Sequence, residues 1–178
     1  MLVATYAERP DLAERTGEIE DVWPEFMHHG EVTTRYWPAL RREIPELQLV
    51  LYDEEADAVV GRGQTVPTSW DGTVEGLPEG VDDVLERWFE GRVPRPTTLS
   101  VLVAVVDPRR QGEGLSYRII EGMRELARRN GLDALIAPVR PTLKARYVVE
   151  GALVPVEIDR EADAGRYVEP NVWMRHAV

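Results

Sequence analysis

The stretch from 99 to 139 constrains the fold more than any other part of the sequence. It begins with an almost unbroken apolar run at 99–106, which is typical of a strand covered on both faces. A helical stripe of apolar residues follows at 113–130, and Asn130-Gly131 is a typical helix end. A second apolar run occupies 134–139. The pattern predicts a strand, a helix and a second strand joined by a right-handed crossover.

The residues before this unit predict a further set of strands and short helices. Gly61 and Gly63 interrupt one of these strands and indicate a bulge or a close approach of another backbone. We expect a strand at 2–9, a short helix from the N-cap Asp11 to about Ile19, one or two helices broken by prolines within 23–44, a hairpin with strands at 47–52 and 58–67, and an amphipathic helix at 81–89.

The length and composition exclude several classes of protein. A chain of 178 residues predicts a single domain, 1–178, with a core of its own. With no cysteine, the sequence excludes disulfides, thiolate metal sites and a cysteine nucleophile. It contains no membrane-length apolar run, and its start does not resemble a signal peptide, so we expect a cytoplasmic protein that does not bind membranes. The net charge of −11 disfavours nucleic-acid binding.

The charge is distributed unevenly along the chain. Residues 1–98 hold 9 basic and 21 acidic side chains, whereas 99–178 hold 12 and 11. Within 107–146 there are nine basic and five acidic residues, which gives a locally positive segment in a negative protein. We therefore expect any anionic ligand to bind in this segment.

The turn between the strand at 99–106 and its helix has the chemistry of an anion site. A helix N-terminus leaves about four N–H groups without internal partners and carries roughly +0.5 charge. Gly112 and Gly114 allow phosphates to approach the backbone, and Arg109 and Arg110 precede them. The alternative is that the glycines only form a tight turn and the arginines only face solvent.

The turn does not match two common nucleotide-binding signatures, but it resembles a third. A dinucleotide fingerprint needs a third glycine where this chain has Tyr117, and the Gly-Lys-Ser/Thr of a P-loop is absent. The segments Val106-Asp107-Pro108 and Gln111-Gly112-Glu113-Gly114-Leu115-Ser116 resemble the motif of the Gcn5-related N-acetyltransferases. Ser116 stands where that family usually has Gly or Ala, and it is small enough for the same packing.

The resemblance implies an α/β (α+β) fold like that of Gcn5-related N-acetyltransferases. Its mixed central sheet would splay between the strands at about 99–106 and 134–139, with helices on both faces. It also implies acetyl-CoA, or coenzyme A, as cosubstrate. The pantetheine arm would pair with the backbone of Val105 and Val106. The residues expected to hold the pyrophosphate are Arg109, Arg110, Gln111, Gly112, Glu113, Gly114, Leu115 and Ser116.

The resemblance implies direct transfer of an acyl group to an amine, with Tyr147 as the general acid that protonates the leaving thiolate. Tyr147 precedes a segment, 148–153, that resembles a later family motif, although a packed core tyrosine is the alternative. The strand at 99–106 lacks the Glu that some relatives use, and Glu150 is a weak substitute as base. His28, His29 and His176 lack metal-ligand spacing, so we expect no metal site.

The acceptor is expected to be an amine of a small molecule or peptide. Trp23, Tyr36 and Trp37 either line its pocket or pack in the core. The acidic first half favours a cationic amine such as a polyamine, an aminoglycoside or a peptide N-terminus. Assembly as a homodimer is left open. Two other readings remain: a catalytically silent domain of the same fold that binds coenzyme A or a partner, and an unrelated α/β interaction module.

The regions of the predicted domain follow from this reading. Acceptor-side helices and the hairpin occupy about 11–70, the acyl-CoA-binding core about 98–142, and a C-terminal segment 143–178. Only 141–146 remains for a helix after the strand at 134–139, which is less than about two turns. We therefore expect this segment to be shortened relative to similar proteins, and it would border both the thiol and the acceptor.

Overall fold

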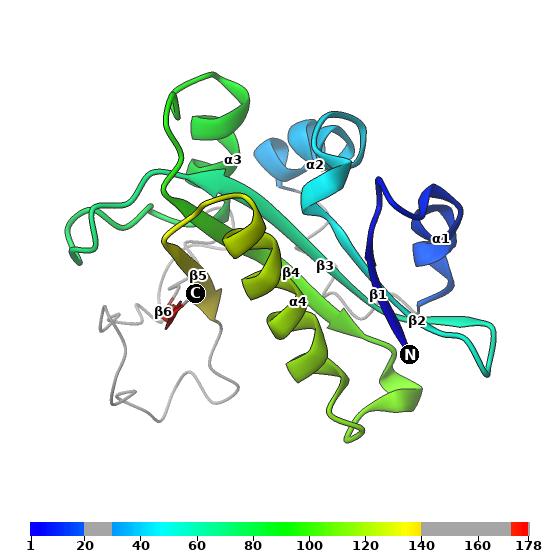
Figure 1. The fold of residues 1–178 in the computed structure, drawn as a ribbon. Helices are drawn as coiled ribbons and strands as arrows, with labels where there is room; N and C mark the ends of the chain where they lie inside the picture. Colours follow the sequence, from blue (N-terminus) through cyan, green and yellow to red (C-terminus); the bar gives the residue numbers. More distant parts are fainter. Residues whose placement is uncertain (20–29, 140–171, 178) are drawn as a thin grey trace, which may run out of the picture.

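The computed structural model describes residues 1–19, 30–139 and 172–177 (Figure 1). Its elements, including three short 3₁₀ helices labelled η, are β1 Leu2–Thr5, α1 Pro10–Glu14, η1 Arg15–Glu18, α2 Glu31–Glu43, η3 Pro45–Leu47, β2 Leu49–Asp53, β3 Ala58–Thr68, α3 Val81–Phe89, β4 Thr98–Val106, η4 Pro108–Arg110, α4 Leu115–Arg129, β5 Ala134–Val139 and β6 Val172–Ala177.

The six strands form one mixed sheet in which the spatial order follows the chain from β1 to β6. Four neighbouring pairs are antiparallel, and only β4 and β5 run parallel. Helix α4 connects these two strands, because a parallel pair needs a crossover and cannot be closed by a tight turn. The predicted strand, helix and strand are therefore confirmed, as is a mixed central sheet.

Strands β4 and β5 pair over only part of their length. The paired residues are Thr98 with Ala134, Leu99 with Leu135, and Ser100 with Ile136. Beyond Ser100, β4 continues to Val106 against β3, while β5 continues to Val139 against β6. The two central strands thus separate in the direction of their carboxyl ends, which confirms the predicted splay.

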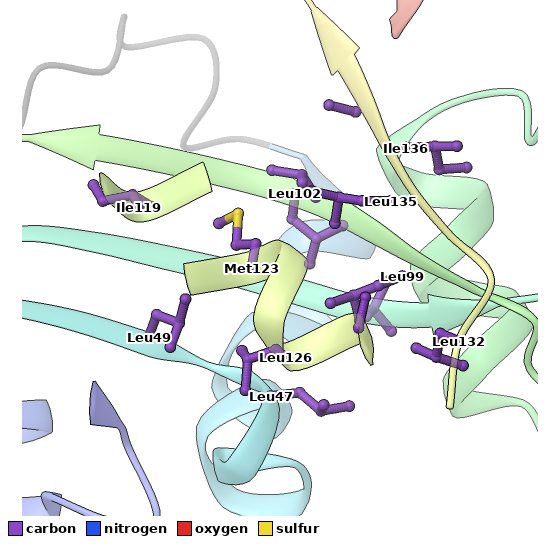
Figure 2. Close-up of a cluster of buried hydrophobic side chains, with 14 of the residues drawn as sticks. Leu47, Leu49, Leu99, Leu102, Ile119, Met123, Leu126, Leu132, Leu135 and Ile136 are labelled. Atoms are coloured by element: carbon purple, nitrogen blue, oxygen red, sulfur yellow. The ribbon is translucent and has the colours of Figure 1, made fainter. Parts of the chain in front are cut away.

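Helix α4 lies directly on the sheet because two glycines of β3 make room for it. A Cβ at Gly63 would lie 2.4 Å from Met123 Cε, and one at Gly61 would lie 2.9 Å from Ile119 Cδ1. Figure 2 shows Met123 and other apolar side chains of α4 among leucines of the strands. The close-approach reading of these glycines is correct. The bulge reading also holds beside Gly61, because Leu51 pairs with Gly61 and Tyr52 pairs with Val59, which leaves Val60 without a partner in the register.

The opposite face of the sheet is covered by the N-terminal helices. Leu49 and Leu51 of β2 belong to the main core, which includes the buried side chains of α4. Val50 between them packs in a second cluster with Leu12 of α1. Because successive strand residues point to opposite faces, Val50 and Leu12 lie on the side of the sheet away from α4. Helices therefore occupy both faces, as predicted.

Three local expectations are wrong in detail. Strand β1 ends at Thr5, and Arg9 precedes α1 in place of the predicted cap Asp11, because Pro10 takes the first helical position, where its missing N–H costs nothing. Helix α2 continues through Pro38 to Glu43 without a break.

In the part of the chain that the structure describes, no helix combines the length and apolar character needed to cross a membrane.

Candidate functional site

The turn after β4 is held by the carboxylate of Asp107, which is only 3% exposed. Its Oδ1 accepts a hydrogen bond of 2.9 Å from the main-chain N–H of Arg109. The Arg109 guanidinium donates to the same carboxylate, with Nη2 at 2.6 Å from Oδ2, and holds the pKa of Asp107 below its usual value. This capping begins η4 and turns the chain away from the sheet toward α4.

Two glycines in this turn adopt a backbone conformation that other residues rarely take. Gly112 has φ of 84° and Gly114, the N-cap of α4, has φ of 75°. An added Cβ would meet no atom within 4 Å at either position. The left-handed backbone, and not tight packing against the protein, therefore requires glycine here. The absence of side chains leaves the backbone accessible to a ligand on this side.

The main-chain N–H groups of 111–117 form a cluster of hydrogen-bond donors. Among the described residues, none of them donates to a protein acceptor, and the first bond of the helix runs from Arg118 N–H to the Gly114 carbonyl. Helix α4 has 15 residues, so its dipole adds partial positive charge at this end. The geometry of the turn fits an anion such as pyrophosphate.

Arg110 ties the turn to the end of β2. Its Nε donates to Glu113 at 2.7 Å, and its Nη1 donates to Asp53 at 2.9 Å. These contacts lower the pKa of both carboxyls. Arg110 thus neutralises the one acidic side chain within 111–116. Arg109 differs, because its side chain is 73% exposed while it contacts Asp107, and it can reach a bound ligand.

Among the described residues, no strand pairs with the outer edge of β4 beyond the point where β5 diverges from it. Asp107 N–H donates to the Val60 carbonyl of β3, so main-chain groups of Asp107 and Val105 face β3. Main-chain groups of Val106 and Ala104 therefore point to the opposite edge, toward the splay. Of the two predicted residues, Val106 lies at the open edge, while Val105 directs its main chain to β3. Sequence reasoning missed Ala104, although strand alternation from Val106 could have identified it.

A shallow groove of about 360 Å³ runs along α4 beyond its N-terminus. It is lined by Ser116, Tyr117, Ile120, Glu121 and Arg124. Gly122 faces Val3 and Leu49 at the β1 side of the helix, so Ser116 and Ile120 lie on the opposite flank, toward β5. The groove and the donor cluster meet at Ser116 and Tyr117, which belong to both.

The remaining predicted residues are distributed as follows. Five of them lie outside the described residues, namely Tyr147, Glu150, His28, His29 and Trp23. His176 lies in β6 opposite Leu135.

The two described aromatics of the predicted acceptor set pack against other apolar side chains. Tyr36 stacks on Phe89 of α3 with ring centroids 5.1 Å apart, and Trp37 contacts both core clusters. These contacts favour the core reading over an acceptor pocket. In the described ranges, no group of three His, Cys, Asp or Glu residues could hold a metal ion.

The chain has sequence similarity to an arginine N-acetyltransferase, avaD, of Aspergillus versicolor. The two are 28% identical over 96% of this chain. The match spans 64% of the length of that relative. No known protein-family profile matches the chain.

Solved structures show the same fold. Naa20 of Chaetomium thermophilum, in complex with a bisubstrate analogue, superposes with a TM-score of 0.52 at 14% identity, over 99% of this chain and 86% of that one. The GNAT-like decarboxylase GphF, with isobutyryl-CoA, gives 0.52 at 17% identity, over 79% and 66%. The splayed sheet and these superpositions show that the chain has the fold of the Gcn5-related N-acetyltransferases.

Proposed function

We propose that the protein is an acyl-CoA-dependent N-acyltransferase that uses acetyl-CoA and transfers the acetyl group directly to an amine of a small molecule or peptide. One observation carries this proposal: the donor cluster at 111–116 lies at the end of the strand whose outer edge is open. A phosphate site and an unpaired strand edge in one line suit a ligand with a pyrophosphate and an amide-containing arm.

The residues of the turn have distinct roles in this proposal. Main-chain N–H groups of 111–116 bind the pyrophosphate, with Gly112 and Gly114 giving it access. Arg109 contacts the phosphates through its exposed guanidinium. Arg110 positions the turn through Asp53 and Glu113. The amides of the pantetheine arm pair with Ala104 and Val106 as an added strand would.

The chemical step needs positioning more than covalent catalysis. Acetyl-CoA, when bound, supplies a thioester whose carbonyl carbon the acceptor amine attacks. The C–N bond forms as the C–S bond breaks, and the nitrogen loses a proton to solvent or to a base. A main-chain N–H at the open edge of β4 stabilises the developing negative charge on the carbonyl oxygen. Tyr147 gives its hydroxyl proton to the thiolate.

Other features of the proposal come from the sequence and the relative. The acceptor is an amine. The relative avaD is named as an arginine N-acetyltransferase, and arginine is an amine of this kind. We keep the division into acceptor-side elements at 11–70, an acyl-CoA core at 98–142 and a C-terminal segment at 143–178. A cytoplasmic location and the option of a homodimer also remain predictions.

A thermal shift with acetyl-CoA tests binding first. At a ligand concentration 100 times Kd, binding stabilises the folded state by about 2.7 kcal/mol. Release of free thiol over a panel of amines, including L-arginine, then tests transfer. A protein that binds acetyl-CoA but releases no thiol with any acceptor would not be the proposed enzyme.

Replacement of Tyr147 by Phe tests the assigned acid. The variant keeps the ring and loses only the proton that the thiolate needs, so turnover should fall by about 10²-fold or more while acetyl-CoA affinity stays unchanged. An unchanged turnover would remove Tyr147 from the mechanism. Circular dichroism of both proteins checks that the fold is the same.

A catalytically silent domain that binds coenzyme A is the second candidate. Strand β4 carries no titratable side chain from Thr98 to Val106, so the open edge itself offers neither an acid nor a base. The fold also serves a decarboxylase, GphF, so it does not by itself require amine transfer. The two candidates share the acetyl-CoA thermal shift and differ in acceptor-dependent thiol release.

A further inference from the structure

Four buried polar side-chain atoms in the described part of the chain have no hydrogen-bond partner. They are Arg62 Nε, Gln64 Oε1, Thr68 Oγ1 and Ser100 Oγ. Burying a polar atom without a partner costs free energy, so most such atoms in folded proteins are satisfied by protein, water or ligand. Two such atoms that lie close together therefore point to a polar ligand.

The strand register places all four on one face of the sheet. Arg62, Gln64 and Thr68 are separated by even numbers of residues on β3, so their side chains share a face. Ser100 lies opposite Val66, which belongs to the same series. Gly61 and Gly63, in the alternate series, face α4. The unpaired atoms thus lie on the side away from α4, where α1 and η1 pack.

Arg62 brings a positive charge to this face that no carboxylate of the described residues neutralises. Its only hydrogen bond there runs from Nη1 to the Thr16 carbonyl and is 3.5 Å long. Four other arginines each pair with at least one carboxylate, namely Arg9, Arg15, Arg109 and Arg110. An arginine held in place without an acidic partner is suited to binding an anion.

A second arginine and a tyrosine add to this arrangement. Arg41 has its Cζ 5.9 Å from the centre of the Tyr6 ring, and it has no ion pair among the described residues. Burial raises the pKa of Tyr6, although Arg62 and Arg41 oppose that shift. Tyr6 is therefore a neutral phenol at physiological pH and does not offset the two positive charges.

The polar atoms lie close to the strand that borders the splay. Arg62 is opposite Val105 and Gln64 is opposite Val103, so both sit one strand away from the open edge of β4. Residues two apart on a strand have Cα atoms about 7 Å from each other. Two long side chains at that spacing can converge on one small molecule. The buried Gln64 oxygen, on a residue 8% exposed, can accept a hydrogen bond from an N–H donor.

We propose that the acceptor is a free α-amino acid, whose carboxylate is bound by Arg62 and whose amine is held by Oε1 of Gln64. The inference rests on the proposed function and names the class of acceptor for the same site. An α-amino acid presents a carboxylate and an N–H donor separated by one carbon, which is the combination that these two side chains complement. Arg62 binds this acceptor in both ground state and transition state, and its contribution falls on KM.

Matched pairs of acceptors test the proposal. L-arginine and L-phenylalanine are compared with their α-carboxamides, which keep the amine and the side chain and lose only the carboxylate charge. We expect kcat/KM to be at least tenfold higher for the acid of a pair that is turned over. In Arg62→Met this preference should fall to near one through KM, with Arg62→Lys retaining part of it. Arg95→Met removes the same charge from an exposed loop and should change nothing.

A binding measurement separates failure of this inference from failure of the proposed function. Calorimetric titration of the same acids and amides, with coenzyme A present and absent, does not depend on turnover. A preference for the acid that Arg62→Met removes supports the site even if no thiol is released. Equal binding of acid and amide, or a preference that survives in Arg62→Met, would overturn it. An unchanged acetyl-CoA thermal shift and circular dichroism spectrum show that the variant is folded.

Discussion

Replacing Ser116 by Asp is the sharpest test of the anion site. Ser116 is exposed at the second position of α4, within the cluster of unpaired N–H donors. A carboxylate in the first turn of a helix interacts favourably with the dipole, by about 0.3–1 kcal/mol. The same carboxylate would repel a pyrophosphate bound to that turn. Protein stability and ligand affinity should therefore change in opposite directions.

The size of the repulsion follows from the distance between the charges. A carboxylate on Ser116 would lie about 6 Å from a phosphate on the neighbouring N–H groups, and two unit charges at that separation repel by about 0.7 kcal/mol in bulk water or about 2.8 kcal/mol at an effective dielectric constant of about 20. Because about 1.4 kcal/mol corresponds to tenfold in affinity, we expect acetyl-CoA to bind about 3-fold to 100-fold more weakly.

Isothermal titration with acetyl-CoA, alongside thermal unfolding without ligand, measures both effects. Ser116→Asn is the neutral control of similar size, and Val74→Asp adds the same charge to an exposed loop between β3 and α3. Both controls should bind acetyl-CoA like the native protein. If Ser116→Asp bound acetyl-CoA as tightly as Ser116→Asn at low ionic strength, the pyrophosphate would not lie at this turn.

Three further substitutions test the fold. Gly63→Ala should lower the free energy of unfolding by about 1–3 kcal/mol, because its Cβ would lie 2.9 Å from Cγ2 of the β-branched Ile119 as well as against Met123. Gly17→Ala should have little effect, since nothing lies within 4 Å of the added Cβ. Leu99→Ala, at a fully buried core position, should cost about 2–5 kcal/mol in a urea titration. Asp107→Asn should destabilise the protein by about 1 kcal/mol at pH 7. Unfolding curves down to pH 2 should show this difference shrinking as the pH falls through the lowered pKa of Asp107, because the native carboxylate then protonates. A difference in stability that does not depend on pH would refute the charged role of Asp107.

Much of the fold could be predicted because its signals are local. The helix at 81–89 and the strand at 134–139 were predicted at the bounds the structure has. Their periodicity and their glycine or proline boundaries depend on neighbouring residues only. The N-terminal cap was not predictable in the same way, because Asp11 and Pro10 compete for the start of one short helix. Helix α2 passes through Pro38 since packing against α3 and β3 compensates for the lost hydrogen bond.

The sequence alone determined the donor turn of this protein. The turn contains two glycines, a capping aspartate and the first residue of a helix within ten residues, so its geometry follows from local backbone preferences. Only the tertiary structure decided what surrounds that turn. It pairs Arg110 with Asp53, 57 residues away, opens the edge of β4 at Ala104 and Val106, and gathers Arg62, Gln64 and Ser100 on one face. These contacts join residues far apart in the chain, and strand register, which no local pattern specifies, brings them together.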